Sequence, residues 1–403
     1  MRKLVIITVL CNVMLLFGSN SNDFDTILQK LIADCPEFAV LRLNNTATVE
    51  TERSVNRLSN PEIEVEQVWG SKGVGNKFDL SVSQGFDWPT LYRARARAIN
   101  AQSTANMLME QSAIIEKMLE VKSLLVDIIF QKKIIEISQL VYNHMVELEK
   151  ASKESYEHGE ISKLEYKRTE LERIQTSIQL KENERLLDEL YTTLENTTGK
   201  LNCRALTSDL KDVPEWILEP ESNYEDKIER YDPRMAYLKA SAEAIELGTQ
   251  VEKKSASLPS FNIGYVFQRE QGETFNGFNI SMSLPIYGRK SIITASKANV
   301  LSAQLAIQTE QISILSKMRN QRRTALSLAR ELEDYSGIFS KDNYSDLLQL
   351  ALEGGETDNI HYLQEINYYI GVTSQYIELQ HQYNLALVSL NRYNMFSESD
   401  HSF

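Results

Sequence analysis

Apolar and polar residues alternate in four short segments of the chain, at about 62–70, 77–86, 260–269 and 276–284. A period of two places every second side chain on the same face of a β-strand, so each segment predicts a strand with one apolar face. Glycines separate the two members of each pair, which predicts two hairpins. Strands of about nine residues suit both a tilted membrane crossing and a half-buried soluble sheet, so length and alternation alone do not separate the two.

Aromatic residues near the strand ends favour the membrane. Such residues concentrate at the two membrane–water interfaces, where one part of the ring is apolar and another is wet. The residues concerned are Trp69, Phe86, Trp88, Tyr92, Phe275 and Tyr287. We therefore predict four membrane-crossing strands in each chain.

Each strand pair is followed by a much longer pattern. From about 90 to 156 an apolar or aromatic residue recurs at every seventh position, with no proline or glycine between them, which predicts one long helix with a coiled-coil seam. At ~1.5 Å per residue this helix reaches roughly 100 Å, so we expect an elongated molecule. The seam residues are Met107, Ile114, Val121, Ile128, Ile135 and Tyr142.

A glycine at 159 ends this helix, and a returning helix is expected at about 162–197. Its apolar residues also keep sevenfold spacing, but in two phases, which suggests a stutter. The first set is Leu164, Leu171 and Ile178, and the second is Leu180, Leu187 and Leu194. We assign both sets to the core of the helical bundle.

Landmarks of the first half of the chain recur about 200 residues later. The pairs are Pro36 and Pro233, Pro61 and Pro259, Phe78 and Phe278, Gly159 and Gly355, and Tyr166 and Tyr362. Five agreeing pairs predict two tandem structural repeats rather than two independent domains. The predicted divisions are a signal peptide at 1–22, a first repeat at 23–199, an equatorial linker at 200–231, a second repeat at 232–396 and a tail at 397–403.

The N-terminus has the order of a secretory signal. Arg2 and Lys3 precede an apolar run from Leu4 to Phe17, and small and polar residues follow. The run is shorter than the ~20 residues of a spanning helix, so we predict export rather than anchoring. Cys11 leaves with the signal. Cys35 and Cys203 remain, and an oxidising compartment would permit a disulfide between them that the sequence does not establish.

Composition excludes several functions. The net charge of −13 leaves no basic surplus for nucleic acid, and the sequence has only five His and three Cys. The histidines are too widely separated for a zinc site. There is neither a Gly-x-Ser-x-Gly elbow nor a His-Glu-x-x-His helix. We therefore expect no enzyme activity, no catalytic or cofactor-binding residues and no metal site.

The order, spacing and duplication of these motifs resemble the TolC-like outer membrane efflux protein family, closest to its cation and heavy-metal efflux branch. The residues that carry the resemblance are Asn60-Pro61, Gln84 to Pro89, Tyr156 to Ser162, Leu164 to Tyr166 and Ser283 to Gly288. The resemblance implies a mainly α fold with a small β part. It implies a homotrimer whose 12-stranded barrel crosses the outer membrane of a Gram-negative bacterium, in contact with its lipid, above a long periplasmic α-helical tunnel.

The same resemblance implies a function as the exit duct of a tripartite efflux system, with a periplasmic adaptor protein and an inner membrane pump as partners. Two tips would receive the adaptor, and a tunnel mouth would lie just beyond the second tip. The first tip is Gly159, Glu160, Ile161 and Ser162, and the second is Gly355, Glu356, Thr357 and Asp358. Relatives often place aspartates at the mouth where this chain has His361 and Gln364, with Glu365 nearby. In this chain Glu356, Asp358 and Glu365 could supply negative charge near the mouth, but they also suit a solvated helix face.

Other functions stay open at this point. A type I protein secretion system uses an outer membrane component of the same kind, and a soluble periplasmic coiled-coil scaffold would share the long helices without a barrel. The cargo is equally open among metal ions, drugs and polypeptides, because no cargo-specific motif is present.

Overall fold

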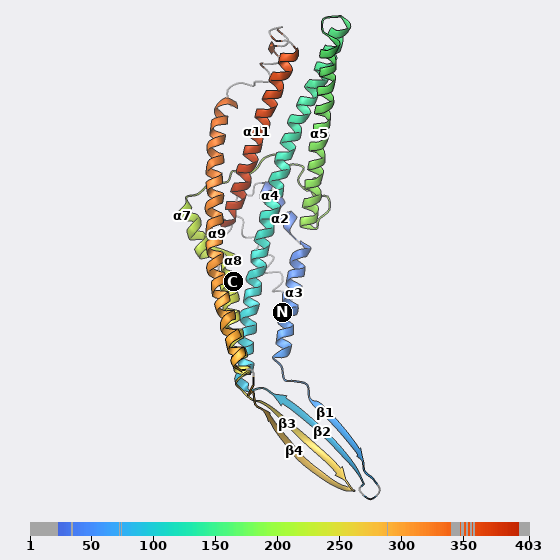
Figure 1. Cartoon of the computed structure of the whole chain (residues 1–403), viewed down its shortest axis with the longest axis vertical. Helices are drawn as coiled ribbons and strands as arrows, with labels where there is room; N and C mark the ends of the chain where they lie inside the picture. The colour runs from blue at the N-terminus through green and yellow to red at the C-terminus, as the bar shows by residue number, and fades with distance from the viewer. Residues whose placement is uncertain are drawn as a thin grey trace. The chain divides into compact units, whose positions relative to one another are not determined.

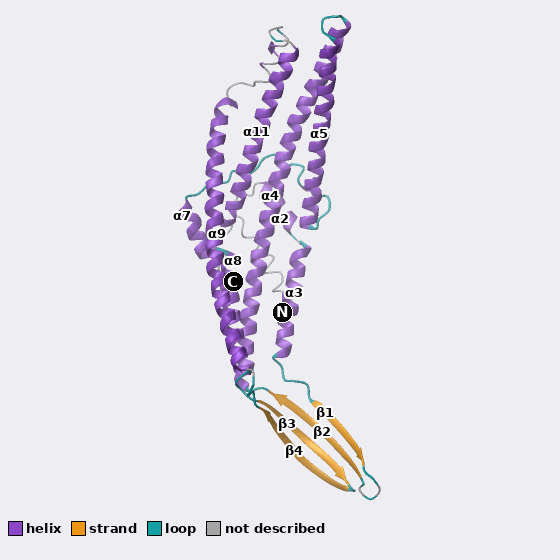
Figure 2. Ribbon diagram, viewed as in Figure 1, coloured by secondary structure: helices purple, strands orange, loops and turns teal. Residues whose placement is uncertain are grey.

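A computed structural model of the chain describes residues 23–394 apart from 34, 72, 74, 288, 340–346, 348–349, 352–353, 355–356 and 358. The predicted signal peptide and tail lie outside the described residues. The described part is mostly helical, with one small antiparallel sheet (Figure 1 and Figure 2), which confirms the predicted mainly α fold with a small β part. None of its helices contains a segment long and apolar enough to cross a membrane.

The described helices range from four to 69 residues in length. They are α2 (Asp23–Ile32), α3 (Pro36–Val55), α4 (Pro89–Glu157), α5 (Lys163–Thr198), α6 (Cys203–Leu206), α7 (Glu221–Tyr231), α8 (Pro233–Ser255), α9 (Arg289–Phe339) and α11 (Asn359–Asn391), followed by the 3-10 turn η2 (Arg392–Asn394). The long helix expected at 90–156 is thus α4, and the returning helix is α5. The predicted linker contains two short helices, α6 and α7.

The sheet joins the two predicted hairpins. Its strands are β1 (Glu62–Trp69), β2 (Asn76–Phe86), β3 (Ser260–Glu270) and β4 (Glu273–Ser283). Their order is β1-β2-β3-β4, and every neighbouring pair is antiparallel. The central contact between β2 and β3 therefore connects the first half of the sequence to the second. The outer edges of β1 and β4 have no neighbouring strand among the described residues.

The chain forms two compact units, each of which draws on both halves of the sequence. The first comprises Met1–Glu37, Ile114–Tyr231 and Ile314–Phe403, and the second comprises Phe38–Ala113 and Asp232–Ser313. In the second unit, α3 contacts α4 where the Asn45 side-chain amide donates to the Asn106 carbonyl at 3.3 Å. The Ser296 hydroxyl of α9 donates to the carboxylate of Glu252 on α8 at 2.8 Å.

The core of the first unit is built from long helices. Val141, Met145 and Leu148 of α4 form a buried cluster with Tyr362 and Ile366 of α11. Each of these side chains is less than 9% exposed. The spacing of three and four residues places them on one side of each helix, so this cluster holds α4 and α11 together.

The sevenfold seam of α4 is buried at its middle. Val121 and Ile128 are 0% exposed, whereas Met107 near the beginning of the helix is 57% exposed. The middle of the predicted seam therefore packs within the chain. Its N-terminal part presents apolar surface to the outside.

Only one of the two sets predicted on α5 is buried within the single chain. Leu180 and Leu194 are buried, as expected, but the first set is exposed, with Leu164 at 80%. The reason is that a different side of α5 faces α4 in this region, where the buried Thr169 hydroxyl donates to Ser152 at 3.3 Å. The members of the exposed set, Leu164, Leu171 and Ile178, are called the α5 stripe below.

Candidate functional site

The first predicted tip is a compact reversal between α4 and α5. Gly159 has a φ of 78°, in the left-handed region. Its N–H donates to the carbonyl of Tyr156 at 3.0 Å, and the N–H of Glu160 donates to the carbonyl of Ser155 at 2.9 Å. These two bonds satisfy carbonyls in the last turn of α4, the arrangement typical of a helix that ends at glycine. Glycine is needed here for its backbone conformation rather than for space, since nothing lies within 4 Å of the position of an added Cβ.

A reciprocal cap begins α5 three residues later. The backbone N–H of Glu165 donates to the Ser162 hydroxyl at 3.2 Å, while the N–H of Ser162 donates to the Glu165 carboxylate at 2.6 Å. This capping box satisfies two donors that would otherwise lack partners. The backbone of the tip is thus fixed by hydrogen bonds on both sides of Ile161, which is half-buried.

The exposed surface of the tip is acidic. Glu154, Glu157 and Glu160 are all exposed there. The Nδ1 atom of His158 lies 2.7 Å from the carbonyl oxygen of Glu154, to which the protonated ring donates. This hydrogen bond, with the nearby carboxylate of Glu160, raises the pKa of His158 above its ordinary value.

A ring stack ties the two helices together just below the tip. The rings of Tyr156 and Tyr166 lie 5.6 Å apart with an angle of 9° between their planes. The Lys167 ammonium lies 5.7 Å from the centre of the Tyr166 ring. Because the tyrosine stack joins α4 to α5, the two helices are already packed together where the tip begins.

The second predicted tip lies largely outside the described residues. Gly355, Glu356 and Asp358 are not described. Of the neighbouring positions, the N–H of Gly354 donates to the carbonyl of Leu350 at 2.9 Å, and the side chain of Thr357 is half-buried. Contact of either tip with an adaptor therefore stays a prediction.

The predicted tunnel-mouth residues lie in the first turns of α11. His361 is exposed, and its Nε2 atom lies 3.9 Å from the carboxylate of Glu365 one turn later. Tyr362 and Ile366, the next residue in each case, are buried against α4. The His361–Glu365 pair therefore lies on a different side of α11 from the core. The side chain of Gln364 lies outside the described residues.

The register of the sheet separates its side chains into two chemically different faces. Partners across the ladders point to the same side, so alternate rows can be assigned from the pairing. Most side chains on one face are apolar or aromatic: Ile63, Val65, Trp69, Phe78, Leu80, Val82, Phe86, Phe261, Ile263, Tyr265, Phe267, Phe278, Ile280 and Met282. The same face also contains the polar residues Gln67, Asn76, Gln84, Arg269, Thr274 and Asn276. The other face is mostly polar and contains Glu62, Glu64, Glu66, Lys77, Asp79, Ser81, Ser83, Asn262, Gln268, Asn279, Ser281 and Ser283, together with the apolar residues Val68, Val266 and Phe275.

The apolar face of the sheet is open in the single chain. Phe278 is 83% exposed, and every residue of β1 and β4 is exposed. Soluble proteins rarely expose a contiguous apolar surface of this extent, which indicates that lipid or another protein covers this face. The polar face contains carboxylates, hydroxyls and amides, which suit contact with water.

Aromatic side chains lie at both ends of the apolar face. Trp69 is 76% exposed at the end of β1, and at the other end the Trp88 ring packs 5.5 Å from that of Phe261. Nearby, the backbone N–H of Asp87 donates to the Tyr92 hydroxyl at 3.0 Å. Phe275 was predicted to belong to this interfacial set, but it lies on the polar face, because its partner across the ladder is Gln268.

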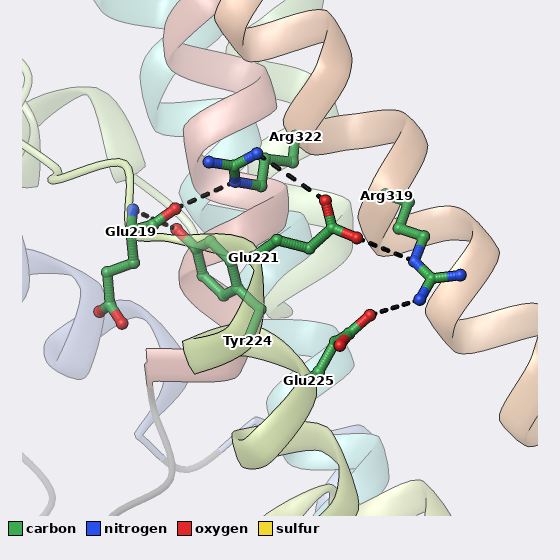
Figure 3. Close-up of polar contacts among 6 residues, drawn as sticks. All are labelled: Glu219, Glu221, Tyr224, Glu225, Arg319 and Arg322. Carbon is green, nitrogen blue, oxygen red and sulfur yellow. Dashed lines mark hydrogen bonds and ion pairs between the residues drawn. The ribbon is translucent and has the colours of Figure 1, made fainter.

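A charged clip that the sequence did not reveal joins α7 to α9 (Figure 3). The guanidinium of Arg319 contacts the carboxylates of both Glu221 and Glu225, the first at 3.0 Å. The Arg322 guanidinium donates to the backbone carbonyl of Glu219 at 3.1 Å. The partners are separated by 94 to 103 residues along the chain. The only signal in the sequence was the spacing of four between the two glutamates, which places both on one side of a helix.

No metal centre is assembled within the part of the chain that the structure describes, where no three His, Cys, Asp or Glu side chains are grouped suitably. One of the scattered histidines has a structural partner instead. The Nε2 atom of His381 on α11 lies 2.7 Å from the carboxylate of Asp127 on α4, and its ring lies 5.2 Å from that of Phe130.

Neither a family model nor a curated protein sequence matches the chain. Solved structures share its fold. A membrane protein from Pseudomonas aeruginosa is similar with a TM-score of 0.78 and 14% identity, over 93% of this chain and 92% of that one. The CmeC outer membrane channel of Campylobacter jejuni is similar with a TM-score of 0.75 and 12% identity, over 94% and 87%. The MtrE outer membrane channel of Neisseria gonorrhoeae is similar with a TM-score of 0.66 and 14% identity, over 92% of this chain and 89% of that one.

At these low identities the likeness concerns the fold, and it extends over nearly the whole of each chain. It agrees with the resemblance to the TolC-like family noted from the sequence motifs. The protein has the fold of outer membrane channels.

Proposed function

We propose that three copies of the chain assemble into an outer membrane channel. The observation that carries this proposal is the open four-stranded sheet with one apolar face. In hydrocarbon the unpaired backbone groups along β1 and β4 would each cost several kcal/mol, so a spanning sheet must close into a barrel. Four strands are too few to close, since small barrels have about eight. Four strands from each of three chains would form a 12-stranded barrel, with the polar face lining the lumen.

The size of the strands is consistent with this role. β2, β3 and β4 each have 11 residues. At ~3.3 Å per residue they are roughly 36 Å long, which crosses the apolar part of an outer membrane when the strand is tilted by about 45°. The aromatic residues at both ends of the apolar face would then lie at the two interfaces with lipid headgroups.

We propose that the helices form a periplasmic tunnel below the barrel, so that the assembly is the exit duct of a tripartite efflux system. The inner membrane pump would select cargo and supply energy, and a periplasmic adaptor would join it to the duct. The fold shared with solved outer membrane channels supports this assignment. The cation and heavy-metal branch stays a prediction, because channels with several different names match at similar TM-scores.

We propose that the tips contact the adaptor. The first tip supports this role through its exposed position and its fixed backbone, which would lose little conformational entropy on binding. Its acidic surface would suit a partner with basic residues. The second tip and the mouth residues are assigned by analogy with the first and with the family.

The α5 stripe supports an assembly of helices. A sevenfold repeat of exposed leucine and isoleucine is the pattern of a coiled-coil seam that lacks its partner helix. A soluble coiled-coil scaffold would also cover this stripe, but it would leave the apolar face of the sheet without a function. A type I secretion component would use the same channel for polypeptides.

Deletion of the gene tests the function. The mutant should become more susceptible to the natural cargo, measured across divalent metals, detergents and dyes, and should regain resistance with the intact gene. A secretion component would instead show loss of one exported polypeptide with unchanged susceptibility. Recovery of the protein from membranes by high salt, without a heat-sensitive oligomer on gels, would favour the soluble scaffold and overturn the channel.

A further inference from the structure

Two turns that are far apart in the sequence pack against each other in the first compact unit. One lies between α2 and α3, where Ala33 and Cys35 are described, and the other follows α5 at residues 199–202. The Lys200 ammonium donates to the carbonyl of Lys30 in the last turn of α2. A Cβ added to Gly199 would lie only 2.8 Å from the Cδ atom of Pro36, so the backbones of the two turns approach closely.

Cys35 lies in the first turn, and Cys203 is the first residue of α6, directly after the second turn. Both thiols contact residues at or just after the end of α5. The Cys35 Sγ atom lies 4.0 Å from the carbonyl oxygen of Thr197. The Cys203 Sγ atom lies 3.7 Å from the hydroxyl of the next residue, Thr198, and 3.4 Å from the carbonyl oxygen of Lys200. Both thiols are free in this structure, and both residues are buried, at 4% and 0% exposure.

From this convergence we infer that Cys35 and Cys203 form a disulfide in the exported protein. The inference rests on the proposed export, because an oxidising compartment is needed. Removal of the predicted signal peptide would take Cys11 with it, and the three cysteines of the sequence would be reduced to these two. Neither thiol would then have another intramolecular partner.

The reaction is a thiol–disulfide exchange with an oxidised dithiol oxidase of the compartment. One cysteine loses its proton and attacks the oxidase disulfide, which forms a mixed disulfide and releases one oxidase thiolate. The second cysteine then loses its proton and displaces the remaining oxidase sulfur. The two electrons and the protons leave with the oxidase, which departs as a dithiol. The bond would fasten the start of the chain to the end of α5.

Burial sets the order of events. Desolvation raises the pKa of the Cys203 thiol above its ordinary value in the folded chain. Since the thiolate is the attacking species, exchange with an external oxidase is fastest before this contact is buried. The bond would therefore form during folding after export and then be protected from reduction.

Peptide mapping without reduction tests the inference directly. Protein recovered from the outer membrane fraction is denatured in N-ethylmaleimide without reductant and digested with trypsin. We expect one linked species that joins residues 31–42 to residues 201–204, and dithiothreitol should convert it to the two separate peptides. Recovery of both peptides alkylated from outer membrane protein would overturn the disulfide and leave the proposed channel untouched.

A second arm separates failure of the disulfide from failure of export. Purified protein is refolded in a glutathione redox buffer and mapped in the same way, while cell fractionation reports its location. If the cellular protein is not in the envelope, the proposed function fails. The refolded sample alone then tests whether Cys35 and Cys203 can form the disulfide. The linked peptide in that sample would support the geometry, and free thiols there would overturn it.

Serine variants distinguish a disulfide from simple packing. With a disulfide, Cys35→Ser, Cys203→Ser and the double variant should lower the unfolding temperature equally, since each removes the same bond. Wild-type protein that has been unfolded and refolded in dithiothreitol should have the lower unfolding temperature of the variants, and the same treatment should leave the variants unchanged. Additive decreases, with no effect of dithiothreitol on the wild type, would contradict the inference.

Discussion

At the scale of single residues, Gly159 determines whether α4 can reverse into α5. Its left-handed backbone carries the two hydrogen bonds that end α4, and the cap of α5 begins three residues later. A β-branched residue in this conformation costs about 1–2 kcal/mol, whereas asparagine tolerates it. If the tip contacts the proposed adaptor, Gly159→Val should deform the tip and reduce export strongly, while the proposed trimer should still reach the outer membrane.

The matched control for this prediction is Gly159→Asn, which should retain most export. Resistance assays measure export, and unheated gels of outer membrane fractions measure the trimer. A double replacement of Gly159 and Gly355 by bulky residues should abolish export. Normal export from that double variant would remove the assignment of both tips to adaptor contact.

Lys122 supplies a second prediction at the residue scale. The side chain is buried at 4% exposure, and its ammonium donates to the side chain of Asn391 at 3.0 Å. Burial lowers the pKa of Lys122, partly opposed by the carboxylate of Asp25. The charged form is therefore disfavoured on folding at neutral pH, and this cost falls as pH rises above the folded-state pKa towards the ordinary value of about 10.4.

We expect Lys122→Met to raise the midpoint of urea unfolding at neutral pH, because a buried charge is replaced by an apolar side chain of similar size. The difference from the wild type should shrink as the pH rises towards 10. Lys163→Met, at an exposed position at the start of α5, serves as the control and should have little effect at either pH. A destabilised Lys122→Met protein with no pH dependence would show that the hydrogen bond to Asn391 outweighs the cost of burial.

At the scale of elements, the clip between α7 and α9 attaches the linker to the long helices. Arg319 contacts two carboxylates, but its side chain is 51% exposed, so solvent and salt screen the attraction. We expect Arg319→Ala to destabilise the attachment of α7 slightly at low salt and less at high salt. Hydrogen exchange of α7 should become faster. Arg53→Ala, which removes an exposed pair within α3, should leave the exchange of α7 unchanged.

The elements also show what a sequence pattern can and cannot specify. Period-two alternation identified all four strands, because most side chains on one face of this sheet are apolar. The sevenfold repeat correctly predicted helices, but it did not reveal which repeats are covered. Leu194 and Leu171 belong to similar patterns, yet the first is 0% exposed and the second 66%. Coverage depends on which side of α5 meets α4, and that is a property of the tertiary structure.

At the scale of the whole molecule, contacts between distant segments were beyond the reach of the sequence. The pairing of β2 with β3 places Val82 opposite Tyr265, and the clip places Arg319 near Glu221. No local period encodes either contact. The reversal at Gly159 was predicted, by contrast, because glycine reports the local backbone conformation. The Ser162–Glu165 capping box is equally local, although its spacing did not enter the prediction of the tip.

The two faces of the sheet lead to a test of the whole assembly. Ile280 and Asn279 are neighbours on β4, but the first is on the apolar face and the second on the polar face. If the apolar face meets lipid, Ile280→Lys should cost roughly 2–4 kcal/mol near the middle of the membrane, whereas Asn279→Lys should be tolerated in a water-filled lumen. We expect the Ile280→Lys variant to lose the heat-sensitive trimer from outer membrane fractions and the Asn279→Lys variant to keep it. Equal behaviour of the two variants would argue against a membrane-spanning barrel, since a sheet in water presents both positions to the same solvent.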